Sequence, residues 1–262
     1  MTALHATLAP SAAHRWMRCP GSVRLSAGIT EVPSAFAAEG TAAHRLAEVC
    51  LRGGFDAGRF EGHVVDTADK TSAAIRRGYK GNGHTVFPIT GEMIEAVQLY
   101  LDVAREYMAE ADEFEIEHRL NLSGFVEDVF GTGDVTAYIA KKRRIIIIDL
   151  KYGKGVAVEV VENEQEMTYG LGVAERHHNR GVDDIELVIV QPRAPHRDGP
   201  VRRWIAPVDK LYEHAMAMQQ AALAVADPKA PLIPGSWCQF CKAAAICPAI
   251  INYSTPSAKP AK

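Results

Sequence analysis

The chain has 262 residues, of which 47% are hydrophobic and 23% charged, ordinary values for a globular protein with one large domain or two small ones. No apolar run approaches the ~20 residues of a membrane helix, and the N-terminus lacks the pattern of a secretory signal, so we expect a cytoplasmic protein. The net charge of -3 argues against a nucleic-acid coat protein, although it is compatible with an enzyme that has a local basic groove.

The first half of the chain predicts two helices separated by a polar segment. Residues 1–38 contain three prolines and no periodic pattern, so we expect irregular structure there. From Thr41 apolar residues repeat at helical spacing, and a second helix should follow Thr90, whose hydroxyl can cap its first turn. Residues 52–89 are glycine-rich and polar and predict a loop or small insertion. The apolar stripe of the first helix is Ala43, Leu46, Ala47, Cys50 and Leu51.

The second half alternates strands with helices, which is typical of an α/β domain. Strands are expected at 113–120, 126–140, 143–153, 184–192 and 202–207, and helices at 160–181, ended by Gly181, and at 208–227. The second and third strands should pair as a hairpin through the basic turn KKRR. We therefore expect one α/β domain over residues 1–250, with a central mixed sheet flanked by helices, and a disordered tail at 251–262.

Two acids are expected at one end of this hairpin. Asp134 lies in GTGDVTAY, where two glycines let other groups approach the backbone, and Asp149 ends a strand of four consecutive isoleucines. Neighbouring carboxylates repel each other unless a cation lies between them, and oxygen ligands suit Mg²⁺ or Mn²⁺. The alternative is that Asp134 caps a turn and Asp149 is a solvated acid at a strand end.

Four further side chains can complete such a site. Lys151 is two residues from Asp149 on a strand, so it points to the same face and can meet a phosphate or simply form an ion pair. Gln165 and Tyr169 are four residues apart and share one helix face, where they can hold a phosphate. His44 lies off the apolar stripe of the first helix. Taken singly, ordinary surface or helix-packing roles explain the last three equally well.

Three of the five cysteines gather near the C-terminus, in WCQFCKAAAICP. The spacing of Cys238, Cys241 and Cys247 indicates a metal site that needs a fourth thiolate. Cys19 is the best candidate, because Cys50 fits the apolar stripe of a helix. Four such thiolates can hold zinc or an iron–sulfur cluster, and they would join the two ends of the chain.

The order of these motifs resembles the RecB-like branch of the PD-(D/E)xK nucleases, most closely its iron–sulfur members, such as the AddB nuclease domain and the CRISPR adaptation nucleases. EGTAAH, GTGDVTAY, IIDLKYGKG and QEMTY are similar to successive motifs of that family, and the opening HRWMRCPGS resembles phage-encoded proteins of the group. The resemblance runs from about Ser11 to Pro248. It implies a restriction-endonuclease-like core whose termini are joined by a Cys₄ cluster.

The resemblance also implies a role for each site residue. The expected ligands of one or two Mg²⁺ or Mn²⁺ ions are His44, Asp134, Asp149 and the backbone carbonyl of Leu150. Lys151 would orient water or hold the phosphate, and Glu117 and Glu127 are further carboxylates within potential reach. The expected DNA-binding residues are Gln165, Tyr169, Arg15 and Arg18. The expected ligands of a [4Fe–4S] cluster, or alternatively of Zn²⁺, are Cys19, Cys238, Cys241 and Cys247.

Together these features predict a metal-dependent DNA nuclease, in the form of an exonuclease that acts on single strands or duplex ends in recombination or end processing. We expect a recombination protein as its partner. If the protein is phage-encoded, we expect it in the bacterial host cell. A second hypothesis is a non-catalytic DNA-binding or assembly module with the same fold and a structural Cys₄ site. A third is a zinc-stapled protein that hydrolyses another substrate.

Overall fold

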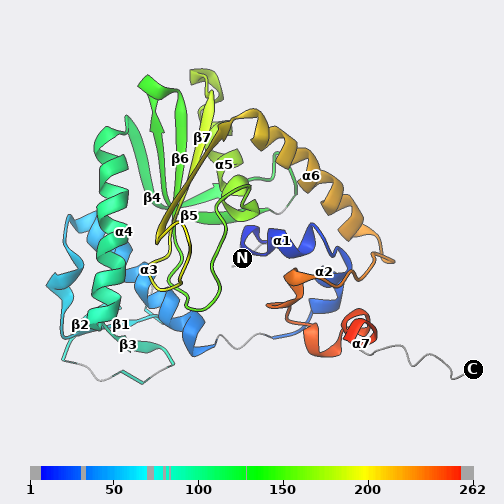
Figure 1. Ribbon diagram of the computed structural model, residues 1–262, viewed down its shortest axis with the longest axis horizontal. Helices are drawn as coiled ribbons and strands as arrows, with labels where there is room; N and C mark the ends of the chain where they lie inside the picture. The colour runs from blue at the N-terminus through cyan, green and yellow to red at the C-terminus, as the bar shows by residue number, and fades with distance from the viewer. Residues whose placement is uncertain are drawn as a thin grey trace, which may run out of the picture.

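A computed structural model of the protein describes residues 7–30, 34–69, 74–78, 81–82, 84–127 and 129–254. A five-stranded mixed sheet, in the order β4-β5-β6-β7-β8, lies at its centre with helices on both faces, which confirms the predicted α/β class (Figure 1). The strands are β4 (Glu113–Asn121), β5 (Phe130–Ile139), β6 (Arg144–Leu150), β7 (Asp184–Val190) and β8 (Val201–Pro207). Within this described part, no helix has the length and apolarity needed to cross a membrane.

The isoleucine strand β6 divides its side chains between two hydrophobic cores. Ile146 and Ile148 pack on the sheet face covered by α3 and α4, whereas Ile145 and Ile147 pack on the face covered by α5 and α6. Successive side chains of a strand point to opposite faces, so a central strand covered on both sides needs an unbroken apolar run. The four helices are α3 (Ala35–Gly53), α4 (Gly91–Glu110), α5 (Glu164–Arg176) and α6 (Asp209–Ala226).

The connections around β6 bring several elements to one end of the sheet. β5 and β6 form the predicted antiparallel hairpin, with Val135 opposite Ile148. β6 and β7 are parallel, and α5 forms the crossover between them. The side chain of Asn163 caps α5 by accepting hydrogen bonds from the amides of Gln165 and Glu166, at 3.1 and 3.2 Å. The first turn of α5 is thereby fixed next to the carboxyl end of β6.

The boundaries of α3 and α5 differ from those predicted, and α5 starts at Glu164 instead of residue 160 because Asn163 caps it. α3 starts at Ala35, six residues before Thr41, because the side chain of Ser34 caps it and accepts a hydrogen bond from the Ala37 amide. α5 ends at Arg176 and is followed by the short 3₁₀ helix η5 (His178–Arg180), so the prediction that it continues to Gly181 was wrong. The predicted cap of α4 is confirmed, since Thr90 Oγ1 accepts a hydrogen bond from the Met93 amide at 3.2 Å.

Residues 52–89 form more than a loop. After the 3₁₀ helix η2 (Ala57–Phe60), three short strands make a second antiparallel sheet in the order β2-β1-β3. These strands are β1 (His63–Asp66), β2 (Ile75–Arg77) and β3 (Val86–Pro88). Val65 and Phe87 are buried in the core shared with α3 and α4. The polar composition hid the strands because each contributes only one or two apolar side chains, so the loop prediction was wrong at these positions.

The two ends of the described chain lie side by side (Figure 1). The Gly21 amide donates to the Pro231 carbonyl at 3.0 Å, and a Cβ on Gly21 would lie 2.6 Å from the Ala230 carbonyl oxygen, so only glycine permits this approach. The early elements are η1 (Pro10–Ala12), α1 (Ala13–Trp16) and α2 (Gly21–Ser26), and the late ones are η6 (Ser236–Cys238), η7 (Ala244–Ile246) and α7 (Pro248–Ser254).

These terminal elements correct two predictions. The irregular structure expected for residues 1–38 is interrupted by the short helices and by the start of α3. Residues 251–254 of the predicted disordered tail are helical as part of α7, and the remainder of that tail lies outside the described residues.

We expect Ile147→Ala to lower the free energy of unfolding by about 2–5 kcal/mol, because it leaves a cavity at a fully buried position of the central strand. Urea denaturation measures this change. The matched control is Ile205→Ala on β8, where the side chain is 50% exposed and the expected loss is about 0.5 kcal/mol. Equal losses in the two variants would contradict the two-core arrangement around β6.

Candidate metal and phosphate site

The hairpin register places the two predicted acids next to each other. Val135 pairs with Ile148, so Asp134 and Asp149 are the next residues along their strands at the same end of the sheet. Asp149 is buried, and the Leu150 amide donates a hydrogen bond to Asp134 Oδ2 at 2.8 Å. The nearby Gly131 leaves room for Tyr169, since a Cβ there would lie 2.7 Å from the tyrosine ring. This close approach is what the glycines around Asp134 were expected to allow.

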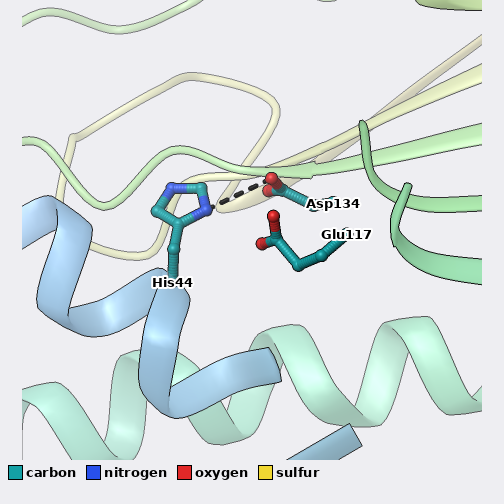
Figure 2. A group of neighbouring side chains, drawn as sticks. All are labelled: His44, Glu117 and Asp134. Atoms are coloured by element: carbon teal, nitrogen blue, oxygen red, sulfur yellow. Dashed lines mark ion pairs between the residues drawn. The ribbon is translucent and has the colours of Figure 1, made fainter. Parts of the chain in front are cut away.

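His44 completes a three-residue group with two carboxylates (Figure 2). His44 Nδ1 lies 3.2 Å from Asp134 Oδ1, and one atom from each of His44, Glu117 and Asp134 falls within 4.8 Å of the others. Glu117 has a positive φ of 48°, which is uncommon for a residue with a long side chain. Strained backbone of this kind concentrates at functional sites, so the strain directs attention to the Glu117 carboxylate. Glu117 thus joins the site more directly than the sequence indicated.

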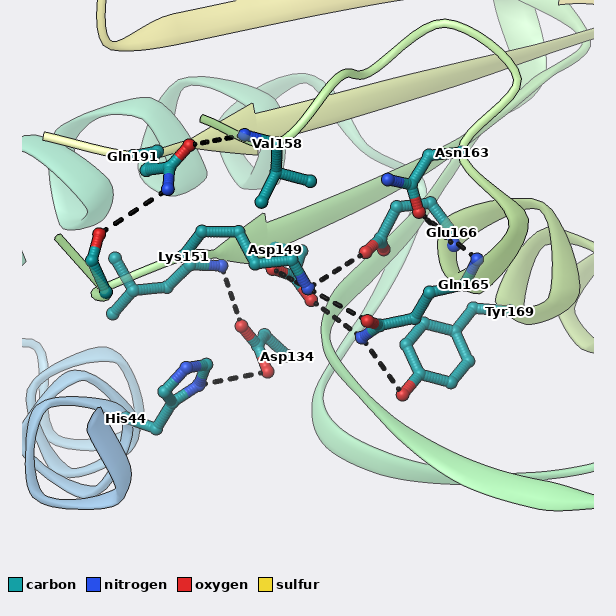
Figure 3. A network of polar contacts seen from close by, with 12 residues as sticks. His44, Asp134, Asp149, Lys151, Val158, Asn163, Gln165, Glu166, Tyr169 and Gln191 are labelled. Atoms are coloured by element: carbon teal, nitrogen blue, oxygen red, sulfur yellow. Dashed lines mark hydrogen bonds and ion pairs between the residues drawn. The ribbon is translucent and has the colours of Figure 1, made fainter. Parts of the chain in front are cut away.

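Lys151 lies at the centre of a second polar group (Figure 3). Its ammonium is 2.8 Å from Asp149 Oδ2 and donates to Gln165 Oε1 at 3.0 Å. Gln165 Nε2 in turn lies 3.3 Å from Asp149 Oδ1 and 3.4 Å from the Tyr169 hydroxyl. The structure therefore brings together the predicted residues Asp149, Lys151, Gln165 and Tyr169, from the end of β6 and the first turns of α5.

Sequence reasoning missed Glu166. This carboxylate is fully buried, and Oε1 lies 3.3 Å from the Lys151 ammonium. Neither of its oxygens makes a hydrogen bond with any residue that the structure describes. The sequence did carry a signal, because Glu166 shares the buried stripe of α5 with Tyr169 and Val173, at helical spacing. Burying an acid among apolar side chains costs free energy unless a cation or a hydrogen-bond donor compensates for it, so such an acid points to a partner or a function.

The electrostatics of the site reflect an excess of acids. Burial, followed by the charge of Asp134, raises the pKa of Glu117 to about 8. Burial, followed by the charge of Asp149, raises the pKa of Glu166 well above its usual range. Burial works against the charge of Lys151, but Asp149 and Glu166 outweigh it and raise the pKa of this lysine. Lys151 is therefore a permanent cation, and the carboxylates around it compete for protons.

The donor set fits a hard divalent cation. Carboxylate oxygens and one imidazole nitrogen are ligands that Mg²⁺ and Mn²⁺ accept, and a cation between the acids would relieve the repulsion that raises their pKa values. His44, Glu117 and Asp134 have the spacing of a ligand set, and Asp149 lies on the adjacent strand. The Leu150 amide already binds Asp134, and the metal-binding role of the Leu150 carbonyl stays a prediction.

The other predicted polar residues lie further from these acids. Arg15 donates to the Phe240 carbonyl at 2.7 Å, and Arg18 forms an ion pair with Glu164. Both arginines thus connect the start of the chain to other segments, and their role in DNA binding stays a prediction. Glu127 is exposed and lines a separate groove against α6, so it does not reach the carboxylate site.

Four cysteines line one pocket between the two ends of the chain, and they are Cys19, Cys238, Cys241 and Cys247. Backbone amides point at two of the sulfur atoms: Ile233 donates to Cys19 Sγ at 3.2 Å, and Gly235 donates to Cys238 Sγ at 3.4 Å. Among the described residues, no three cysteine sulfurs lie within 4.8 Å of one another. Tetrahedral zinc, with Zn–S bonds of about 2.3 Å, needs sulfurs about 3.8 Å apart. The four thiols therefore line one pocket, but they do not have the spacing of a tetrahedral zinc site.

Cys50 differs from the other four cysteines. It is buried in the core on α3, as its place in the apolar stripe predicted, and burial raises the pKa of its thiol to about 12.

In metal-free protein we expect the ring of His44 to titrate near pH 9. Burial opposes protonation, but the Asp134 carboxylate outweighs it and raises the pKa of His44 from 6.5 to about 9. Because the folded-state pKa is the higher one, this ion pair stabilises the fold fully below pH 6.5 and its contribution is lost as the pH rises through about 9. NMR titration of the ring measures the pKa.

Asp134→Asn should lower the pKa of His44, because it removes the charge that holds the proton. The signal of the exposed His178 is the internal control and should not respond to this substitution. An unchanged His44 titration in Asp134→Asn would contradict the ion pair.

Comparison with protein families adds one finding. Residues 5–259 match the family described as Protein of unknown function (DUF2800). The match extends over nearly the whole chain, and it includes the segments that carry the carboxylate site and those that line the cysteine pocket. The protein is a member of the DUF2800 family.

Proposed function

We propose that this protein is a metal-dependent DNA nuclease with a restriction-endonuclease-like core of the PD-(D/E)xK, RecB-like type. The observation that carries the proposal is the convergence of His44, Asp134, Asp149 and Lys151 at one end of the central sheet. These residues come from three different elements and are separated by up to 107 positions in the chain (151 − 44).

The proposed ligands of Mg²⁺ or Mn²⁺ are His44, Glu117, Asp134 and Asp149. When bound, the cation would supply Lewis-acid stabilisation of the negative charge that develops on a phosphodiester in the transition state. The ligands lie on α3, β4, β5 and β6, which are packed elements of the fold, so their relative positions are held more precisely than loop residues would be.

Lys151 has an electrophilic role in this proposal. Its raised pKa keeps it protonated, so it can donate hydrogen bonds to a phosphate or a water but cannot accept the proton of the attacking water. In hydrolysis the water oxygen bonds to phosphorus, one phosphorus–sugar oxygen bond breaks, the water loses a proton and the leaving oxygen gains one. Lys151 stabilises the charge on the phosphate during that exchange, and Glu166 and Gln165 hold its ammonium in place.

Gln165 and Tyr169 are proposed to bind the DNA backbone next to the reacting phosphate. Both are already tied to Asp149 through the Gln165 amide, so they can position a phosphate relative to the acids. Arg15 and Arg18 are proposed to contribute further contacts to DNA. We propose an exonuclease that acts in the cytoplasm on single strands or duplex ends, in recombination or end processing alongside a recombination protein.

The four gathered cysteines are proposed to bind a [4Fe–4S] cluster. The proposal rests on the four cysteines lining one pocket, and a [4Fe–4S] cluster takes one thiolate for each of its four irons. The backbone amides that point at Cys19 and Cys238 would stabilise thiolate charge in either case. The cluster would link the first and last described segments of the domain. Zinc is the alternative occupant, and its binding would require the four thiols to move closer together.

A non-catalytic DNA-binding or assembly module is the alternative function. The exposed Arg18 and the partly buried Arg15 suit such a role, and a structural Cys₄ site would serve it equally well. The buried and strained acids favour the nuclease, because a module that only binds DNA gains nothing from negative charge beside its substrate.

With Mg²⁺ or Mn²⁺ we expect the protein to degrade end-labelled linear DNA, and we expect Asp149→Ala to lower the cleavage rate by about 10³-fold, since a ligand and its charge are lost. Denaturing gels with single- and double-stranded substrates, labelled at either end, measure both the rate and the polarity.

The matched control is Asp183→Asn, which alters an exposed acid outside the site and should leave the rate unchanged. Equal cleavage by Asp149→Ala and the unaltered protein would refute the assignment of the site. Retained DNA binding without any metal-dependent cleavage would instead support the non-catalytic module.

We expect the purified protein to be brown from its iron–sulfur cluster, and Cys241→Ala to bleach the colour and lower the midpoint of thermal unfolding. Visible absorption, together with iron and zinc content, measures the occupant. Cys50→Ala is the matched control and should keep the colour, because Cys50 lies in the core away from the pocket. A colourless protein loaded with zinc would overturn the cluster while leaving the nuclease proposal standing.

A further inference from the structure

A groove of about 330 Å³ opens directly beside the candidate site. It shares Lys151 and Gln165 with that site, and its other walls come from the start of the chain, the segment after β6 and the cysteine segment. The volume falls in the range of about 300–1,000 Å³ that is typical of small-ligand pockets. Whatever occupies the groove would therefore lie next to the phosphate that Lys151 is proposed to hold.

Two aromatic residues, Trp237 and Phe240, line this groove, and each immediately precedes a cysteine of the four-cysteine pocket. Trp237 is fixed by a hydrogen bond from its indole nitrogen to the Ile233 carbonyl at 2.8 Å, and the guanidinium of Arg18 lies 5.9 Å from its ring. Phe240 is 63% exposed, while its carbonyl accepts a hydrogen bond from Arg15 at 2.7 Å. The backbone that carries the Phe240 ring is thus held in place, and the ring itself is open to solvent.

Another part of the lining is also apolar, and its backbone is fixed. Val156 and Val158 line the groove, and the buried Gln191 bonds to both backbones; Figure 3 shows its contact with Val158. Gln191 Nε2 donates to the Val156 carbonyl at 2.8 Å, and the Val158 amide donates to Gln191 Oε1 at 2.9 Å. A groove lined by an exposed ring and by valines, on backbone that hydrogen bonds hold in place, offers apolar surface at little cost in ordering.

The charges around the groove are largely balanced. Arg18 is paired with Glu164, and Lys151 is surrounded by Asp149 and Glu166. His14 lines the groove, and its pKa is lowered by burial and then by the neighbouring Arg15. The groove therefore does not suit a second phosphate as well as it suits a flat, uncharged group attached to the phosphate at Lys151. A nucleobase is such a group.

We propose that the groove is a base-stacking subsite, in which an unpaired nucleobase adjacent to the scissile phosphate stacks on Phe240, with Trp237 extending the surface. The proposal rests on the proposed nuclease function and specifies its substrate as single-stranded DNA or a frayed end. A base in an intact duplex has both faces covered by its neighbours and its edge by its partner, so it must leave the stack before it can reach a ring in the protein. Stacking is sequence-tolerant, because every base has a flat face.

The test measures binding separately from cleavage. The dissociation constant of a fluorescent deoxythymidine oligomer is determined by anisotropy without Mg²⁺ or Mn²⁺, beside an abasic oligomer of equal length and a blunt duplex. We expect Phe240→Ala to weaken binding of the oligomer about tenfold and to leave binding of the abasic strand unchanged, since one stacked base is lost. Ile246→Ala is the matched control, because Ile246 is 59% exposed on the same cysteine segment but does not line the groove.

Each outcome decides between the proposals. Unchanged binding of the deoxythymidine oligomer by Phe240→Ala, or equal binding of the base-containing and abasic strands by the unaltered protein, would overturn the subsite. Equal weakening by Phe240→Ala and Ile246→Ala would also overturn it, since the effect would then belong to the segment and not to the ring. Base-dependent binding without cleavage when Mn²⁺ is added would support the subsite and refute the nuclease. Cleavage, together with binding that Phe240→Ala does not change, would support the nuclease and refute the subsite.

Discussion

Repulsion between neighbouring carboxylates, two of them buried and two partly buried, is the constraint on which the rest of this structure depends. Asp134, Asp149, Glu117 and Glu166 meet at one end of the central sheet, where burial and mutual charge raise the pKa values of the two glutamates. Lys151 and a protonated imidazole offset part of that repulsion, and a divalent cation would offset more. The fold has to hold these groups together against a force that separates them.

The packing around the site explains how it does so. The unbroken isoleucines of β6 are buried on both faces of the sheet, so the strand that ends in Asp149 cannot shift without opening two cores. The crossover helix α5 starts at a capped residue, Asn163, and this cap fixes the turn that presents Gln165 and Glu166. Rigidity here serves the geometry of the site.

Much of this arrangement is local and was readable from the chain. The periods of 2 and 3.6 residues predicted the β5–β6 hairpin, the common side of Asp149 and Lys151, and the common helix face of Gln165 and Tyr169. Capping chemistry predicted the role of Thr90. The place of Cys50 in the core also followed from the apolar stripe of its helix, and the other four cysteines line one pocket, where their binding of a metal stays a prediction. Sequence periodicity and capping rules predict a contact correctly when the two residues are close in the sequence or lie on strands of one hairpin.

The sequence by itself therefore determined the order of the strands and helices around the large sheet, and it identified most of the polar residues that meet at the end of the sheet with Asp134 and Asp149. Only the tertiary structure decided that Glu166 is buried against Lys151, that the backbone of Glu117 is strained beside His44, and that the segment 52–89 adds a second sheet. It also placed Phe240 of the cysteine segment beside the groove that leads to Lys151. The reason is physical: burial, strain and the meeting of chain ends depend on which distant surfaces pack together, and no local period encodes that choice.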